Sequence, residues 1–158
     1  MVQYKSLLTH VKYLGTFIDT KGAMFDIKRQ IRKAYGSSNV LITKFGQCTP
    51  EVKCKLFSAY CSNLYCPQFW YGGTISLLNK LRVAYNNSLR RLLKIPITSA
   101  SDMFASLKIP CFNELLRKCI YSLINRISHS ENSIIKSLSA IPVLLASPMY
   151  NWWNTLLF

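Results

Sequence analysis

The sequence predicts a mainly α-helical protein that begins with a short β-hairpin or strand. Apolar residues recur every three or four positions over most of the chain, which is the pattern of helices with one buried face. Pro and Gly residues divide this pattern into segments of helical length. With 158 residues, 50% of them apolar, the chain is long enough for one compact helical bundle with a substantial core.

The β element is expected at His10 to Thr20, within residues 1–22. This segment alternates loosely between apolar and polar residues and is rich in residues that favour strands. Lys21 and Gly22 follow it and are typical of a turn. We therefore expect a strand or a short hairpin here, ahead of a helical region over residues 23–136.

The first helix is expected from about Met24 to Tyr35. The segment Gly36 to Asn39 should weaken or break it before it resumes over Val40 to Phe45, because Gly, Ser and Asn are poor helix formers. Four residues would face the core: Ile27, Ile31, Ala34 and Tyr35. The other side of the helix carries four cations, which are Lys28, Arg29, Arg32 and Lys33.

A second helix should begin at Thr49-Pro50-Glu51, which combines a capping hydroxyl, a proline at the first position and a carboxylate near the positive end of the helix dipole. It is expected to run to about Tyr65 and to bury Val52, Leu56, Tyr60 and Leu64.

A third helix should follow the Gly72-Gly73 loop, from about Ser76 to Lys94, and should end at Pro96. Its apolar stripe would be Leu78, Leu81, Tyr85, Leu89 and Leu92, and its opposite face would carry Lys80, Arg90, Arg91 and Lys94.

Three further helices are expected. They are a short one from Ser99 to Leu107, a longer one from Phe112 to Ser128, and a last short one capped by Asn132. In the longer helix, Leu116, Ile120, Leu123, Ile124 and Ile127 should face inward, and Glu114, Lys118, Ser122 and Arg126 outward.

The tail at residues 137–158 carries no charge at all. Its length is near that of a membrane span, but Pro142, Pro148 and two Asn residues interrupt it. We expect a packed or irregular tail, and insertion into a membrane is the alternative.

The inventory of residues argues against an enzyme. Six carboxylates stand against 20 Lys and Arg, for a net charge of +14, and they are too scattered to suggest a paired-acid or two-metal site. The sequence has no glycine-rich phosphate loop and no GxSxG motif. Its six cysteines form no CxxC pair. We therefore expect no catalytic residues, no metal, no cofactor and no small-molecule substrate.

The expected location is inside the cell, in the nucleus or the cytoplasm, and not in the secreted fraction. The first residues contain no apolar core of a secretory signal. We expect the cysteines to be reduced side chains within helices, which is typical of a reducing compartment.

The basic helical faces indicate contact with a polyanion. Acids are too few to interleave with the cations, so the charge becomes a fixed surface field rather than a set of ion pairs. Nucleic acid is the expected partner, held through phosphates without sequence specificity. The aromatic run Phe69 to Tyr71 could stack on bases or anchor the core. The expected contacts are Lys28, Arg29, Arg32 and Lys33, then Arg90, Arg91 and Lys94.

Several segments together resemble the reverse transcriptases of non-LTR, LINE-type retrotransposons. KYLGTFID at Lys12 to Asp19 resembles the hairpin that follows the palm of these RNA-directed DNA polymerases. The segments Ile27 to Trp70, Leu81 to Pro96 and Met103 to Ile127 are similar to the helices after that hairpin. The resemblance covers about residues 10–136, while fingers, palm, the Tyr-x-Asp-Asp motif and the endonuclease have no counterpart in this sequence.

This resemblance implies a thumb-like fragment that is inactive by itself. Tyr13, Leu14 and Gly15 would match the element that steadies the primer end. The helices would match the thumb and its C-terminal extension, which hold a template–primer duplex, so the expected ligand is an RNA–DNA hybrid or another double-stranded nucleic acid.

Two alternatives stay open. One is a basic protein anchored in a membrane by residues 137–158. The other is a helical protein-interaction module in which Trp70, Trp152 and Trp153 anchor a partner.

Overall fold

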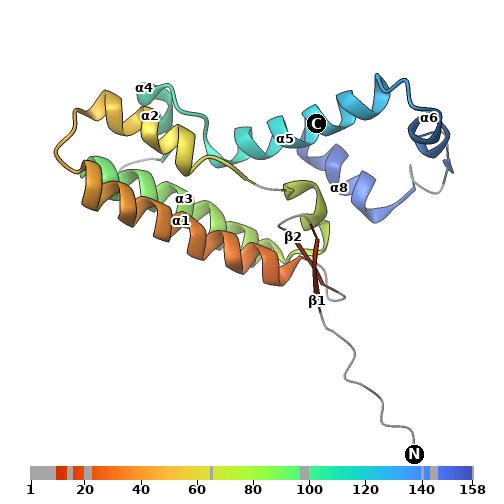
Figure 1. Ribbon diagram of the computed structural model, residues 1–158, viewed down its shortest axis with the longest axis horizontal. Coiled ribbons are helices and arrows are strands. Elements are labelled where there is room, and N and C mark those ends of the chain that lie inside the picture. Colours follow the sequence, from red (N-terminus) through yellow and green to blue (C-terminus); the bar gives the residue numbers. More distant parts are fainter. Residues whose placement is uncertain are drawn as a thin grey trace, which may run out of the picture.

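The structure is a computed structural model that describes residues 10–13, 16–19, 23–64, 66–96, 100–139, 141–142 and 146–157. The predicted fold class is confirmed, since a two-stranded hairpin precedes a set of packed helices (Figure 1). The elements are β1 (His10–Tyr13), β2 (Thr16–Asp19), α1 (Met24–Phe45), α2 (Pro50–Tyr60), the 3-10 helix η1 (Pro67–Gly72), α3 (Ile75–Leu93), α4 (Ala100–Leu107), α5 (Phe112–Ser128), α6 (Ser133–Ser139) and α8 (Pro148–Leu157).

The hairpin docks on the beginning of α1. Its strands are antiparallel, with Val11 opposite Ile18 and Lys12 opposite Phe17. The ring of Phe17 meets the ring of Phe25 edge-on, with 4.8 Å between centroids. The guanidinium carbon of Arg29 lies 5.2 Å from the centroid of the Phe17 ring, within the range of a cation–π contact. These contacts place the hairpin beside the basic side of α1.

The two longest helices, α1 and α3, lie side by side and run in the same direction (Figure 1). Small residues line part of their contact, and the Ser88 hydroxyl donates to the carbonyls of Ala84 at 2.8 Å and Ala34 at 3.3 Å. The predicted stripe of α3 is largely confirmed. Its buried members are Leu81, Tyr85, Leu89 and Leu92, while Leu78 is half-buried.

The predicted break in the first helix is wrong, because α1 continues through Gly36 to Asn39. Within this segment Ser38 is completely buried, and its hydroxyl donates to the Tyr35 carbonyl at 3.1 Å. Packing along α3 stabilises the helix more than the weak propensity of these residues destabilises it.

Replacing Gly36 with alanine is expected to raise the free energy of unfolding by about 1 kcal/mol, since glycine is that much less favourable than alanine inside a helix. Gly36 is exposed, and a Cβ added there meets nothing within 4 Å. Urea denaturation followed by circular dichroism measures the change. Gly46→Ala is the matched control and should destabilise, because its Cβ would lie 2.5 Å from the Ile42 carbonyl oxygen. A destabilised Gly36→Ala variant would contradict the prediction.

The second helix starts where the sequence predicted but buries a different face. It begins at Pro50 after Thr49 and ends at Tyr60, before the expected Tyr65. The predicted core residues Val52 and Tyr60 are 42% and 60% exposed, whereas Phe57 is completely buried. The ring of Phe57 packs against that of Tyr85 on α3, with 5.1 Å between centroids. This aromatic contact, which local periodicity cannot reveal, sets the rotation of α2.

Tyr85 joins α2, α3, α4 and α5. Its ring stacks on Phe104 with 5.4 Å between centroids, and it also lies 6.2 Å from the ring of Phe112. Its hydroxyl donates to the Pro110 carbonyl at 2.9 Å and lies 3.2 Å from the Ser62 hydroxyl. Burial raises the pKa of Tyr85 to about 12, so the phenol is neutral at physiological pH.

The boundaries of α5 agree with the prediction, Phe112 to Ser128. Glu114, in its first turn, accepts a hydrogen bond from the Cys111 backbone N–H at 2.7 Å. Leu116 and Ile120 are buried as expected. Asn132 caps α6 through a hydrogen bond from the Ile134 N–H at 2.9 Å.

The uncharged tail folds back onto the rest of the protein, where α8 packs on α5 and η1 (Figure 1). Trp153 is 4% exposed, and its indole N–H donates to the Gln68 carbonyl at 3.0 Å. Arg117 donates to the Leu156 carbonyl at 2.8 Å, near the end of α8. None of the helices in the described part of the chain is long and apolar enough to cross a membrane.

Trp70 and Trp153 belong to the core. Neither side chain is presented at the surface, so these two residues give no support to the alternative in which they anchor a protein partner. Trp152, the third residue of that set, is half-buried.

Candidate nucleic-acid interface

One cation of the predicted α1 cluster is paired with a buried acid. Asp26 is completely buried, and its Oδ1 accepts hydrogen bonds from Arg29 Nη2 at 2.8 Å and Nε at 3.1 Å. Its Oδ2 accepts the indole N–H of Trp70 at 3.1 Å. Arg29 therefore neutralises a core carboxylate and sits against the hairpin, so we expect it to contribute less to an anion-binding surface than its neighbours.

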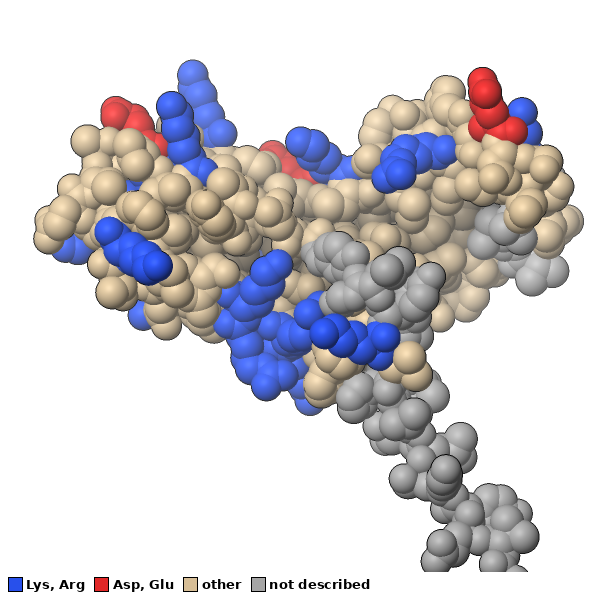
Figure 2. All heavy atoms as spheres, viewed as in Figure 1, with Lys and Arg blue, Asp and Glu red and all other residues tan. Residues whose placement is uncertain are grey.

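The other three cations of this cluster, Lys28, Arg32 and Lys33, are exposed. Lys28 and Arg32 are four residues apart and thus share one side of α1. Figure 2 shows Lys and Arg side chains gathered over the first half of α1 and the neighbouring hairpin, which adds the exposed Lys12. The Asp and Glu side chains in this view lie along the opposite edge of the molecule.

The second predicted cluster lies at the end of α3. Arg91 and Lys94 are exposed, while Arg90 is half-buried and reaches the Asn87 side chain at 3.4 Å. Lys94 closes the helix with a left-handed φ of 58°. Cations near the last turn interact favourably with the helix dipole, which gives these residues a structural role. Ser88 faces Ala34, so the end of α3 that carries these cations lies beside a later part of α1 than Lys28. The two clusters therefore do not merge.

The residues that resemble a primer-steadying element are only partly described. Tyr13 ends β1, but its side chain, together with Leu14 and Gly15, lies outside the described residues. Their role stays a prediction.

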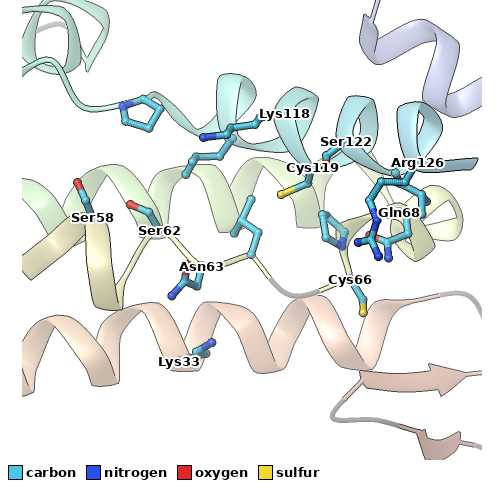
Figure 3. Close-up of a pocket in the computed structure, with 15 residues that line it drawn as sticks. Lys33, Ser58, Ser62, Asn63, Cys66, Gln68, Lys118, Cys119, Ser122 and Arg126 are labelled. Atoms are coloured by element: carbon cyan, nitrogen blue, oxygen red, sulfur yellow. The ribbon is translucent and has the colours of Figure 1, made fainter. Parts of the chain in front are cut away.

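A cleft of about 780 Å³ lies between α5 on one side and α1, the end of α2 and η1 on the other. Three cations line it, Lys33 from α1 and both Lys118 and Arg126 from α5. Figure 3 shows Lys33 rising from α1 while the α5 side chains lie across from it. Among the described residues that line the cleft, none is Asp or Glu. We call this site the basic cleft.

Neutral donors complete the lining of the basic cleft. Hydroxyls come from Ser58, Ser62 and Ser122, and side-chain amides from Asn63 and Gln68 (Figure 3). Cations and N–H or O–H donors with no carboxylate between them concentrate positive potential, which attracts an anion. The basic cleft is thus suited to phosphate groups.

A buried amide lies beneath the basic cleft. Gln30 is 4% exposed, and its Nε2 has no hydrogen-bond partner among the residues that the structure describes. It lines a small cavity of about 10 Å³ that shares Lys33, Asn63 and Leu64 with the basic cleft. That volume is close to the space one water molecule needs, so a water there could link the amide to a ligand above.

The cysteine of α5 in this site does not suggest covalent chemistry. Burial raises the pKa of the Cys119 thiol, and the opposing effect of Lys118 is smaller. The thiol is therefore protonated at neutral pH, and the thiolate that a nucleophile requires is disfavoured. Within the described ranges, no group of three or more His, Cys, Asp or Glu side chains could hold a metal ion.

Sequence reasoning identified Lys33 but not its partners on α5. Lys118 and Arg126 were expected to face outward, without a role. A signal was available, since Lys118, Ser122 and Arg126 recur every four residues on one helical side. Glu114 lies four residues before Lys118 on the same side, and its carboxylate accepts a hydrogen bond from the Cys111 backbone N–H at the N-terminus of α5.

Comparisons of the chain with protein-family models, with curated proteins and with solved structures found no match.

Proposed function

We propose that this protein binds nucleic acid without sequence specificity, through phosphate contacts in the basic cleft and on the exposed cations of α1. The observation that carries the proposal is the convergence of Lys33, Lys118 and Arg126, from two helices, on one cleft whose described lining has no carboxylate. The +14 charge supports it, since a polyanion offers the largest gain from counterion release.

The resemblance to the thumb of LINE-type reverse transcriptases supports the same proposal. In that family the corresponding helices hold the template–primer duplex, and the chemistry belongs to the palm. We therefore propose a binding role with no catalytic step, in which phosphate contacts supply the main attraction.

Binding should weaken steeply with salt. If about four phosphates are neutralised, the logarithm of the association constant should fall with the logarithm of salt concentration with a slope of about −4. Fluorescence anisotropy with a labelled duplex, an RNA–DNA hybrid and a single strand measures this slope. Absence of binding at low salt, or a slope near zero, would overturn the proposed function.

Charge-reversal variants test whether nucleic acid binds at the basic cleft and the exposed cations of α1. We expect Arg32→Glu with Lys33→Glu to weaken binding most, whereas Lys55→Glu with Lys80→Glu makes the same change of net charge at exposed positions outside the basic cleft. Arg29 is left unchanged because its substitution would also remove the cation that pairs with the buried Asp26 carboxylate. Equal losses for the two double variants would assign binding to net charge rather than to this surface.

A further inference from the structure

We infer that the basic cleft holds one strand of nucleic acid, with phosphates on its cations and a base stacked on Tyr71. This inference rests on the proposed function and adds to it a preferred form of nucleic acid, a path and a stacking residue.

The size of the basic cleft favours a single strand. About 780 Å³ is within the range of sites that enclose one small molecule, roughly 300–1,000 Å³. Its cations stand on opposing walls, Lys33 on α1 and Arg126 on α5 (Figure 3). A single sugar–phosphate chain can enter between these walls, whereas a duplex presents its phosphates on a wide convex surface and can contact only the rim.

The position of Tyr71 follows from the geometry of η1. A 3-10 helix has three residues per turn, so side chains three positions apart lie on the same side. Gln68 lines the basic cleft, and Tyr71 lies on the same side of η1 as Gln68, one turn further along and just outside the lining itself. The Tyr71 side chain is 46% exposed. An exposed aromatic ring beside a basic groove is the arrangement on which single-strand binders stack bases.

Buried contacts hold η1, the element that carries Tyr71, in place. Between Gln68 and Tyr71, Trp70 is completely buried and donates to Asp26 at 3.1 Å. The Gln68 carbonyl accepts the indole N–H of Trp153 at 3.0 Å. These two contacts fix η1 against α1 and α8, so that little conformational entropy would be lost when a base stacks.

The buried Gln30 side chain offers a hydrogen-bond donor next to the basic cleft. The Nε2 of Gln30 is buried and finds no acceptor in the described part of the chain, and a buried donor is stabilised when an acceptor reaches it. A phosphate bound at Lys33 lies next to the small cavity that Gln30 and Lys33 share. One water in that cavity would connect the amide to a phosphate oxygen.

The test compares a short oligothymidine with a hairpin duplex of the same length, at low salt. Lys118→Ala with Arg126→Ala should lower the affinity for oligothymidine about tenfold or more and reduce the magnitude of its salt slope by about 1.4, while duplex affinity changes little. Lys55→Ala with Lys80→Ala is the charge-matched control and should leave the preference intact. Thermal unfolding verifies that every variant is folded.

Tyr71→Ala should lower the affinity for oligothymidine about tenfold, and Tyr71→Phe should retain it, because either ring can stack. Phe69→Ala is the control on the same 3-10 helix, since Phe69 is 45% exposed but lies on another side of it. Equal losses for duplex and single strand, or a Tyr71→Ala variant no weaker than Phe69→Ala, would overturn the inference and leave the proposed function standing. Absence of binding to both ligands by the unmodified protein would overturn both.

Discussion

Replacing Asp26 with alanine is expected to lower the free energy of unfolding by about 3 kcal/mol. The change leaves the Trp70 indole N–H buried without an acceptor, which costs about 1–3 kcal/mol. It also removes the two charge-assisted hydrogen bonds from Arg29. The Arg29 side chain is 32% exposed and can turn to water, so its own penalty is smaller than that of a fully buried charge.

Urea denaturation followed by circular dichroism and by tryptophan fluorescence measures this loss. Asp102→Ala is the matched control, since Asp102 is an exposed acid in the first turn of α4, as Asp26 is in that of α1. It should cost no more than about 1 kcal/mol, the value of a carboxylate near a helix N-terminus. Asp26→Asn retains an acceptor for Trp70 and should fall between the two. Equal losses at positions 26 and 102 would contradict the prediction.

The same substitution connects stability with binding. Asp26 holds Trp70, and Trp70 lies in η1 between Gln68 and Tyr71. Asp26→Ala should therefore weaken binding of a single strand even under conditions where the protein remains folded, because the stacking residue loses its support.

Replacing Trp153 with alanine is expected to cost about 3–5 kcal/mol, the range for removing a large buried aromatic side chain. Trp153 is 4% exposed, and it bonds to the Gln68 carbonyl on η1. Its loss should release α8 from α5 and η1. Hydrogen exchange of residues 148–157 should accelerate, and the unfolding midpoint should fall.

Trp152→Ala provides the control for this change. Trp152 is the neighbouring residue and is half-buried, so its replacement should cost less and leave the hydrogen bond to Gln68 intact. If the two variants behave alike, the docking of the tail does not depend on Trp153. The result also bears on the membrane alternative, because the tail cannot keep Trp153 in this core and insert it into a bilayer at the same time.

Patterns that arise within one helix were predictable. The stripe of α3 that includes Leu81 and Leu89, and that of α5 with Leu116 and Ile120, follow from a period of 3.6 residues. Pro50 and Asn132 marked helix starts, since capping depends on neighbours only a few positions away. The fold class followed from these local signals.

The rotation and the continuity of helices needed contacts from elsewhere in the chain. The helix α1 continues through Gly36 because α3 packs along it, and α2 turns Phe57 inward because Tyr85 lies 28 positions further on. Propensity and periodicity describe one segment at a time, so they are overruled when a partner segment offers a larger buried area.

The sequence by itself determined that the protein is helical, strongly basic and poorly supplied with paired acids. Only the tertiary structure decided which cations act together. It assigned Arg29 to the buried Asp26, and it brought Lys33 into one cleft with Lys118 and Arg126. The physical reason is that charge is a property of composition, whereas an anion site requires side chains from distant segments to converge, and that convergence follows from how the helices pack.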